Sequence, residues 1–245
     1  MKRRADRMAR PSAMAHSACM PNAVDQDWAS EAEERLLDAA IRLAPEFGWG
    51  GALVQRIGLE TGLSDADVEL LMPKGAPDLS ALLSRRHDHK ALEALQGIDA
   101  AQLKVRERIH AAVEARIDAA MADEAATKAS ARLLALPVHA PLAVRLGWET
   151  ADKLWRWAGD EATDENHYSK RAILATVLAT TMAARMIGGR DFARKHLSGR
   201  IDQVMAFERW KATRAPKPSE WGKSAAALFG RMRYGPRPDR TPPTP

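Results

Sequence analysis

The sequence is poor in the residues that mark several protein classes. It holds one cysteine, Cys19, so no disulfide can form within the chain and a reducing compartment is expected. Aromatic residues make up 5% of the chain, and no run alternates with a period of two, which argues against strands. No apolar run reaches the roughly 20 residues that span a bilayer, and the most apolar stretch, residues 172–187, is interrupted by Arg185. These absences predict an almost wholly helical chain.

The motifs of common enzyme classes are also missing. The chain has no GxGxxG, no P-loop and no HExxH. Glu107 and His110 form one element of a di-iron site, which needs a second copy and two more carboxylates, so a solvated helix face is the better interpretation. His87 and His89 are two residues apart and point in different directions on a helix. We therefore expect no catalytic residue, no metal and no cofactor.

Positive charge is confined to the two ends of the chain. The net charge is +5, but residues 29–208 carry 23 basic and 27 acidic groups, whereas residues 209–245 carry nine basic and two acidic groups. The basic pI therefore does not predict nucleic-acid binding by the body. Residues 1–28 are expected to be a disordered basic leader. They lack the apolar core of a secretory signal, and a weak likeness to a transit peptide leaves the bacterial and the organellar interpretation both open.

Residues 30–73 are predicted to form a three-helix head. Ser30 and Glu33 are expected to cap the first helix, Gly62 makes a turn after the second, and Ser64 with Asp67 caps the third. This is the outline of a helix-turn-helix. The expected recognition helix is acidic, and no Lys or Arg lies between residues 59 and 73, so phosphate would be repelled. We expect a degenerate helix-turn-helix that does not bind DNA.

Six further helices are predicted over residues 78–213, ending near Gly97, Pro137, Gly159 and the Gly188-Gly189 pair. A three-helix head with a six-helix body, whose last two helices can pair with a twin, is the architecture of TetR regulators. The fold class is therefore all-α and TetR-like, with a lipid-binding and dimerisation body. A ligand-responsive transcription regulator is the alternative function, and it predicts salt-sensitive DNA binding.

Three of the seven tryptophans lie between Trp148 and Arg171. Trp148 and Trp155 share a helix face, and a polar stripe on the next helix continues into Ala175, Leu178 and Met182. Core packing explains such a face as well as a ligand cavity does, but the mixture of small and long side chains in residues 172–187 favours a cavity. The predicted lipid-binding residues are Trp148, Leu154, Trp155, Leu174, Leu178, Met182 and Met186.

Residues 219–234 are predicted to be an amphipathic helix followed by a Pro-rich tail, 235–245. Apolar residues recur there at helical spacing and basic residues are available to anionic head groups. Docking on the chain's own domain or on a twin is the alternative to membrane contact. The predicted membrane-binding residues are Trp221, Lys223, Leu228, Phe229, Arg231, Met232 and Arg233.

Three segments of the chain resemble one known family. They are LLDAAIRLAPEFGW, LLALPVHAPLA and, above all, WRWAGDEATDENHYSKRAILA, within residues 34–212. They are similar to the coenzyme Q biosynthesis accessory proteins, which are TetR-like lipid binders. The resemblance implies a homodimer without DNA binding, which holds an isoprenoid quinone intermediate at a membrane and assists the di-iron hydroxylase of demethoxyubiquinone.

The sequence departs from that family at the segment where we expect the hydroxylase to bind. Where the family has Phe-Asn-Trp-Tyr, this chain has Glu165-Asn166-His167-Tyr168, so two large aromatics are replaced by polar groups. The resemblance also implies a peripheral location, at the cytoplasmic side of a bacterial inner membrane or the matrix side of a mitochondrial one. The predicted partner-binding residues are Asp160, Asp164, His167, Tyr168 and Arg171.

Overall fold

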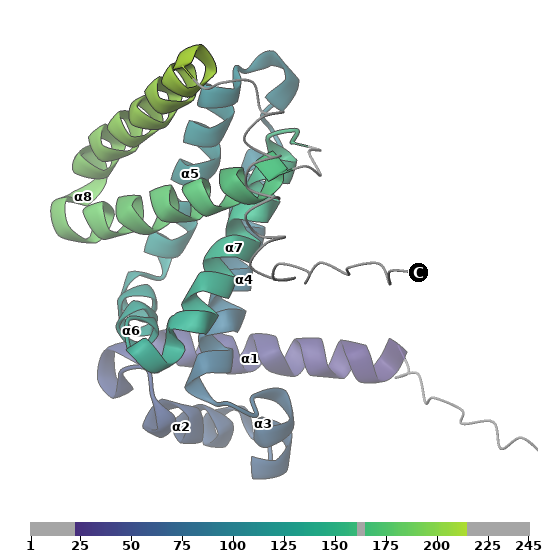
Figure 1. Ribbon diagram of the computed structural model, residues 1–245. Coiled ribbons are helices and arrows are strands. Elements are labelled where there is room, and N and C mark those ends of the chain that lie inside the picture. The colour runs from purple at the N-terminus through teal and green to yellow at the C-terminus, as the bar shows by residue number, and fades with distance from the viewer. Residues whose placement is uncertain (1–22, 161–164, 215–245) are drawn as a thin grey trace, which may run out of the picture. The chain divides into compact units, whose positions relative to one another are not determined.

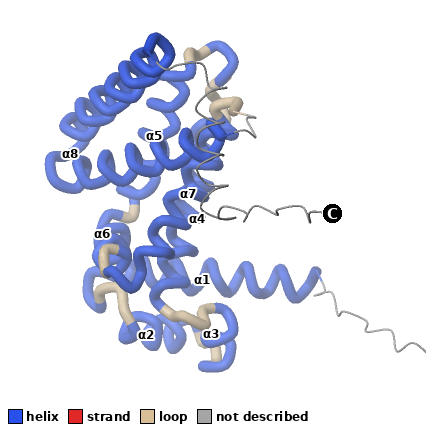
Figure 2. The backbone as a smooth tube through the Cα atoms, viewed as in Figure 1, coloured by secondary structure: helices blue, strands red, loops and turns tan. Residues whose placement is uncertain are grey.

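The computed structural model of the chain describes residues 23–160 and 165–214. These residues form helices joined by short loops, and no strand occurs among them (Figure 2). The all-α prediction is confirmed. The helices are α1 (Ala23–Phe47), α2 (Gly51–Thr61), α3 (Asp65–Leu71), α4 (Ala76–Leu95), α5 (Val105–Ala122), α6 (Glu124–Leu134), α7 (Ala140–Trp157) and α8 (Glu165–Arg214) (Figure 1).

The chain divides into two compact units, residues 1–83 and 84–245. In the first unit, Leu36 and Leu37 of α1 are buried together with Leu53 and Ile57 of α2. The Trp49 indole N–H donates to the Ser80 hydroxyl at 2.8 Å, which satisfies a buried donor.

The capping signals of the head are correct at α3 and wrong at α1. Ser64 accepts from the Asp67 backbone N–H, and the Asp67 carboxylate accepts from the Ser64 N–H, as predicted. Ser30 caps nothing, because α1 begins at Ala23 and runs through it. The helix therefore begins inside the segment expected to be a disordered leader, and only residues 1–22 of that leader lie outside the described residues.

The second unit has a helical core with α5, α7 and α8 at its centre. Val113, Ile117, Leu154, Leu174 and Leu197 are all buried in one cluster. The helix α5 begins at Val105. The Asp99 carboxylate accepts from the Ala101 N–H and holds residues 100–102 in a short 3-10 turn before it.

Gly189 bends α8 into two arms. Its φ is +76° and its ψ is −168°, a non-helical conformation that glycine adopts at low cost. Figure 1 shows the two arms at a sharp angle, and they correspond to the two helices predicted on either side of the Gly188-Gly189 pair.

The first arm and part of the second are more apolar than expected. By length and composition alone, the segment His167–Ala206 contains a window suited to crossing a membrane, and only 22% of that window is buried. The sequence prediction concerned uninterrupted apolar runs, whereas this window qualifies on its mean hydropathy, to which interspersed Ala and Thr side chains contribute. The finding shows that α8 exposes a good deal of apolar surface.

Candidate functional site

The junction between α7 and α8 is held by a cluster of ion pairs. Arg171 is 1% exposed, and its Nε donates to Asp152 Oδ1 at 2.6 Å while its Nη1 donates to Asp160 Oδ2 at 3.2 Å. Lys170 Nζ lies 2.6 Å from Asp160 Oδ1. Burial raises the pKa of Asp160, but the hydrogen bonds and charges of Lys170 and Arg171 outweigh it and hold that pKa below its ordinary value. Asp160 is thus a carboxylate at neutral pH.

Contacts between backbone and side chains fix the same junction. The helix α7 ends at Trp157 and the chain turns at Gly159, whose φ is +82°. The Trp155 indole N–H donates to the Lys170 carbonyl at 3.0 Å, and the Lys170 ammonium lies 5.5 Å from the centroid of the Trp155 ring. Arg108 of α5 donates to the Ala158 carbonyl at 2.8 Å. Three helices therefore meet at this turn.

An aromatic cluster lies beside the ion pairs. The rings of Trp148 and Tyr168 are 5.9 Å apart, those of Trp148 and His167 are 6.5 Å apart, and those of His167 and Tyr168 are 5.3 Å apart. Tyr168 is 66% exposed. We call Trp148, His167 and Tyr168 the aromatic cluster. It offers a ring surface of the kind that anchors protein contacts.

The structure separates the predicted partner-binding residues. His167 and Tyr168 lie in the aromatic cluster, whereas the side chains of Asp160 and Arg171 are 8% and 2% exposed. Arg171 does not lie at the surface as predicted for a partner contact, because its guanidinium pairs with two aspartates within the fold. Asp164 lies outside the described residues, as do all the predicted membrane-binding residues in 219–234.

Most of the predicted lipid-binding residues are packed into the core. Leu154, Leu174 and Leu178 are buried in the main cluster, and Trp155 and Met182 are partly buried against it. Trp148 belongs to the aromatic cluster, and Met186 is partly buried near the bend of α8. The periodicity correctly identified an apolar face, but that face meets other helices.

An open groove lies on the neighbouring face of α8. It has a volume of about 470 Å³, within the usual range for small-molecule sites. Its lining is mostly apolar and comes from both arms of the helix, namely Ala172, Ile173, Thr176, Val177, Arg200, Gln203 and Val204. We call it the α8 groove. Tyr168, Ala172 and Thr176 follow at four-residue spacing, so the groove begins one helical turn from the aromatic cluster.

Arg200 supplies a polar group at the α8 groove. Its Nη1 donates to Gln203 Oε1 at 3.0 Å, while its Nε is buried without a hydrogen-bond partner among the described residues. A buried donor of this kind is costly to leave unsatisfied. An apolar molecule that carries an oxygen acceptor matches this lining.

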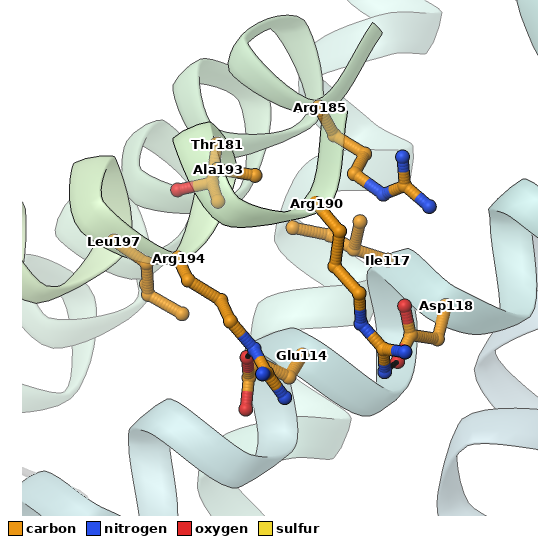
Figure 3. Close-up of a pocket in the computed structure, with 9 residues that line it drawn as sticks. All are labelled: Glu114, Ile117, Asp118, Thr181, Arg185, Arg190, Ala193, Arg194 and Leu197. Atoms are coloured by element: carbon orange, nitrogen blue, oxygen red, sulfur yellow. Dashed lines mark hydrogen bonds and ion pairs between the residues drawn. The ribbon is translucent and has the colours of Figure 1, made fainter. Parts of the chain in front are cut away.

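Two other cavities fit a lipid less well. One, between α5 and both arms of α8, has a volume of only about 20 Å³, room for a single water (Figure 3). There Arg190 and Arg194 point toward Asp118 and Glu114, with which they form ion pairs. The other is open and polar, with His110, Glu114, Arg194, Lys195 and Ser198 around it.

The groove residues were missed because helical periodicity does not indicate how deeply each helix face is buried. Ile173 directly precedes Leu174, so the groove face and the predicted face differ by one position, or about 100° around the helix, and Val177 is buried where the two faces meet. Arg200 lies about 27 residues further on, and it comes near Ile173 only because α8 bends at Gly189. No group of three or more His, Cys, Asp or Glu suited to a metal ion occurs among residues 23–160 and 165–214.

Comparison with known proteins confirms the resemblance seen in the sequence. The COQ9 family model matches residues 140–208, which include α7 and most of α8. The mitochondrial ubiquinone biosynthesis proteins COQ9 of Rattus norvegicus and Homo sapiens are each 26% identical over 170 residues, 66% of this chain and 54% of theirs. COQ9-B of Xenopus laevis is 25% identical over 198 residues, 74% of this chain and 66% of its own. The chain spans about half the length of the mammalian relatives.

A solved structure confirms the TetR-like fold. The TetR transcriptional regulator from Nitrosomonas europaea ATCC 19718 superposes with a TM-score of 0.56 at 18% identity, and the match covers 71% of this chain and 97% of that chain. At this level of identity the likeness concerns the fold alone.

Proposed function

We propose that this chain is a non-catalytic, lipid-binding auxiliary of ubiquinone biosynthesis. In this role it takes an isoprenoid quinone intermediate and presents it to the di-iron hydroxylase of demethoxyubiquinone. The names of its COQ9 relatives support the pathway. The observation that carries the proposal is the α8 groove, an open and largely apolar groove with the guanidinium of Arg200 in its lining.

The groove suits an amphiphile with a polar ring and an apolar tail. Ile173, Val177 and Val204 provide apolar contacts, and burial of apolar area is worth about 25 cal/mol per Å². Arg200 lines the groove, and the N–H groups of its guanidinium that face the groove would donate to a ring oxygen. Because the aromatic cluster lies one helical turn from the groove, an enzyme that binds to the cluster would lie next to the bound ligand.

Mass spectrometry of lipids that co-purify with the full chain tests the proposal. Recovery of isoprenoid quinone species at near-stoichiometric amounts is the expected result. A protein that is empty after gentle purification, and that takes up no quinone from added vesicles, would contradict it. Addition of the hydroxylase then tests the partner, because Tyr168→Ala should weaken the association while lipid content stays unchanged.

Residues 219–234 would bring the chain to the membrane, on the cytoplasmic face in a bacterium or the matrix face in a mitochondrion. Liposome flotation of the full chain and of a chain ending at Ala215 tests this, and equal flotation would refute it.

The last part of the proposal is that the chain forms a homodimer. Sedimentation analysis of the full chain checks it, and a monomer at micromolar concentration is the opposing result.

The alternative of a DNA-binding regulator finds little support in the head. Asp65, Ala66, Glu69 and Leu70 form the exposed side of α3, which would meet phosphate with negative charge. A gel shift at low salt separates the two functions, because the auxiliary role predicts no retained DNA.

A further inference from the structure

At the α7–α8 junction, the two ends of the segment that resembles the family contact each other. Asp160 at one end of the motif binds both Lys170 and Arg171 at the other end. The end of α7 and the start of α8 are therefore joined by charge-assisted hydrogen bonds, which are about twice as strong as neutral ones. Arg171 adds a second tie, to Asp152 within α7.

These ties reach the aromatic cluster through short paths. Arg171 Nη1 donates to the carbonyl of His167 at 3.2 Å, one turn earlier in α8. Asp152 lies one turn after Trp148 on α7. The guanidinium therefore joins the helical turn that carries His167 and Tyr168 to the helix that carries Trp148.

A buried arginine is an expensive way to hold two helices together. Removing a guanidinium and its carboxylates from water costs several kcal/mol, and an apolar contact of similar volume is often more stable. What the guanidinium adds is direction, because its planar donors fix the relative placement of the groups they join. Arg171 touches no open surface, so its effect on any partner must pass through its neighbours.

We infer that Arg171 is a positioning residue, which holds His167 and Tyr168 against Trp148 so that the aromatic cluster keeps one shape for a protein partner. The inference rests on the proposed function where the partner is concerned. The placement of the first turns of α8 can be tested without any partner.

Hydrogen exchange of the full chain tests the placement directly. Arg171→Met should speed exchange in peptides from the first turns of α8 by on the order of tenfold, because it removes at least two charged hydrogen bonds. Arg171→Lys keeps the charge but loses the paired donors of the guanidinium, so it should give an intermediate effect. This conservative variant also provides a comparison that is expected to fold. Ile117→Ala is the matched control, since it creates a core cavity away from the junction. Equal acceleration at this site in the control, at equal loss of stability, would overturn the inference.

Affinity for the hydroxylase then separates the two hypotheses. Tyr168→Ala and Arg171→Met should each weaken binding, and the double variant should lose less affinity than the sum of the two single losses, because both act through the aromatic cluster. If Tyr168→Ala leaves the affinity unchanged, the proposed partner surface fails while the exchange result still decides the role of Arg171. If Tyr168→Ala weakens binding and Arg171→Met does not, the inference fails and the surface stands.

Discussion

His87 Nε2 lies 3.1 Å from Asp123 Oδ2, in a setting where the imidazole is almost completely buried. Burial lowers the pKa of His87, and the charges of Arg116 and, to a smaller extent, Lys90 lower it further. The hydrogen bond and charge of Asp123 oppose this only in part, so the pKa falls from 6.5 to about 4. His87 is therefore neutral at physiological pH, and as a neutral ring it can donate a hydrogen bond from Nε2–H to the Asp123 carboxylate.

This pairing predicts that mild acid destabilises the second unit. Between pH 6.5 and about 4 the unfolded chain binds a proton at His87 and the folded chain does not, so the free energy of unfolding falls as the pH is lowered through this window. The free energy of unfolding lost through His87 is at most about 3 kcal/mol near pH 4. Urea unfolding at several pH values measures it, and His87→Gln should flatten the dependence. His89→Gln, at a side chain that is 75% exposed, is the control and should leave the slope unchanged.

A second buried group predicts a large effect of one substitution. Asp88 accepts hydrogen bonds from Arg116 Nε at 2.7 Å, Thr150 Oγ1 at 2.8 Å and Lys153 Nζ at 2.8 Å. Arg116→Met removes the most buried of the two cations and should lower the free energy of unfolding by about 3 kcal/mol.

Arg145→Met is the comparison for Asp88, because the Arg145 side chain is 60% exposed in its pair with Glu149. Its loss should cost less than about 1 kcal/mol. Chemical unfolding of Arg116→Met and Arg145→Met measures the loss in the free energy of unfolding of each variant. Similar losses would show that the Asp88 network does not have the energetics that its burial implies.

The fold could be predicted from the sequence to the extent that its signals are local. Ser64 with Asp67, Gly62 and the Gly188-Gly189 pair act through their own backbone, and the structure has a cap, a turn and a bend at these places. Ser30 shows the limit of such signals, since a capping pattern inside a longer helical run has no free N–H groups to cap. The site depends on non-local contacts. Nothing in the sequence indicates that Arg171 would bind Asp152 or that Arg200 would come near Ile173.

The turn after α7 gives a prediction about glycine. Gly159 has φ +82°, and a Cβ there would lie 3.2 Å from Nη1 of Arg108, which donates to the Ala158 carbonyl. Gly159→Ala should destabilise the second unit by about 1–2 kcal/mol because an L-residue is strained in this conformation.

Gly199→Ala, in contrast, should stabilise the second unit. It lies in α8 with nothing within 4 Å of the added Cβ, and alanine should stabilise the helix by up to about 1 kcal/mol. Thermal unfolding of the pair checks both signs.

The α8 groove predicts that a charge within it removes the lipid. Thr176 lines the groove, is exposed, and uses its hydroxyl only to bind the Ala172 carbonyl, so its replacement disturbs little of the core. Thr176→Arg should lower quinone content on the order of tenfold or more, because a long charged side chain would occupy the apolar channel.

Thr180→Arg provides the matched control for the groove. Thr180 lies one turn further along α8, and its hydroxyl binds the Thr176 carbonyl in the same manner, but it does not line the groove. The same arginine there should leave the lipid content close to that of the unaltered chain. Because both substitutions add one charge to the same helix, any difference in lipid recovered by mass spectrometry reports the groove itself. Equal loss in the two variants would point to a general effect on α8, and equal retention would move the lipid to another surface.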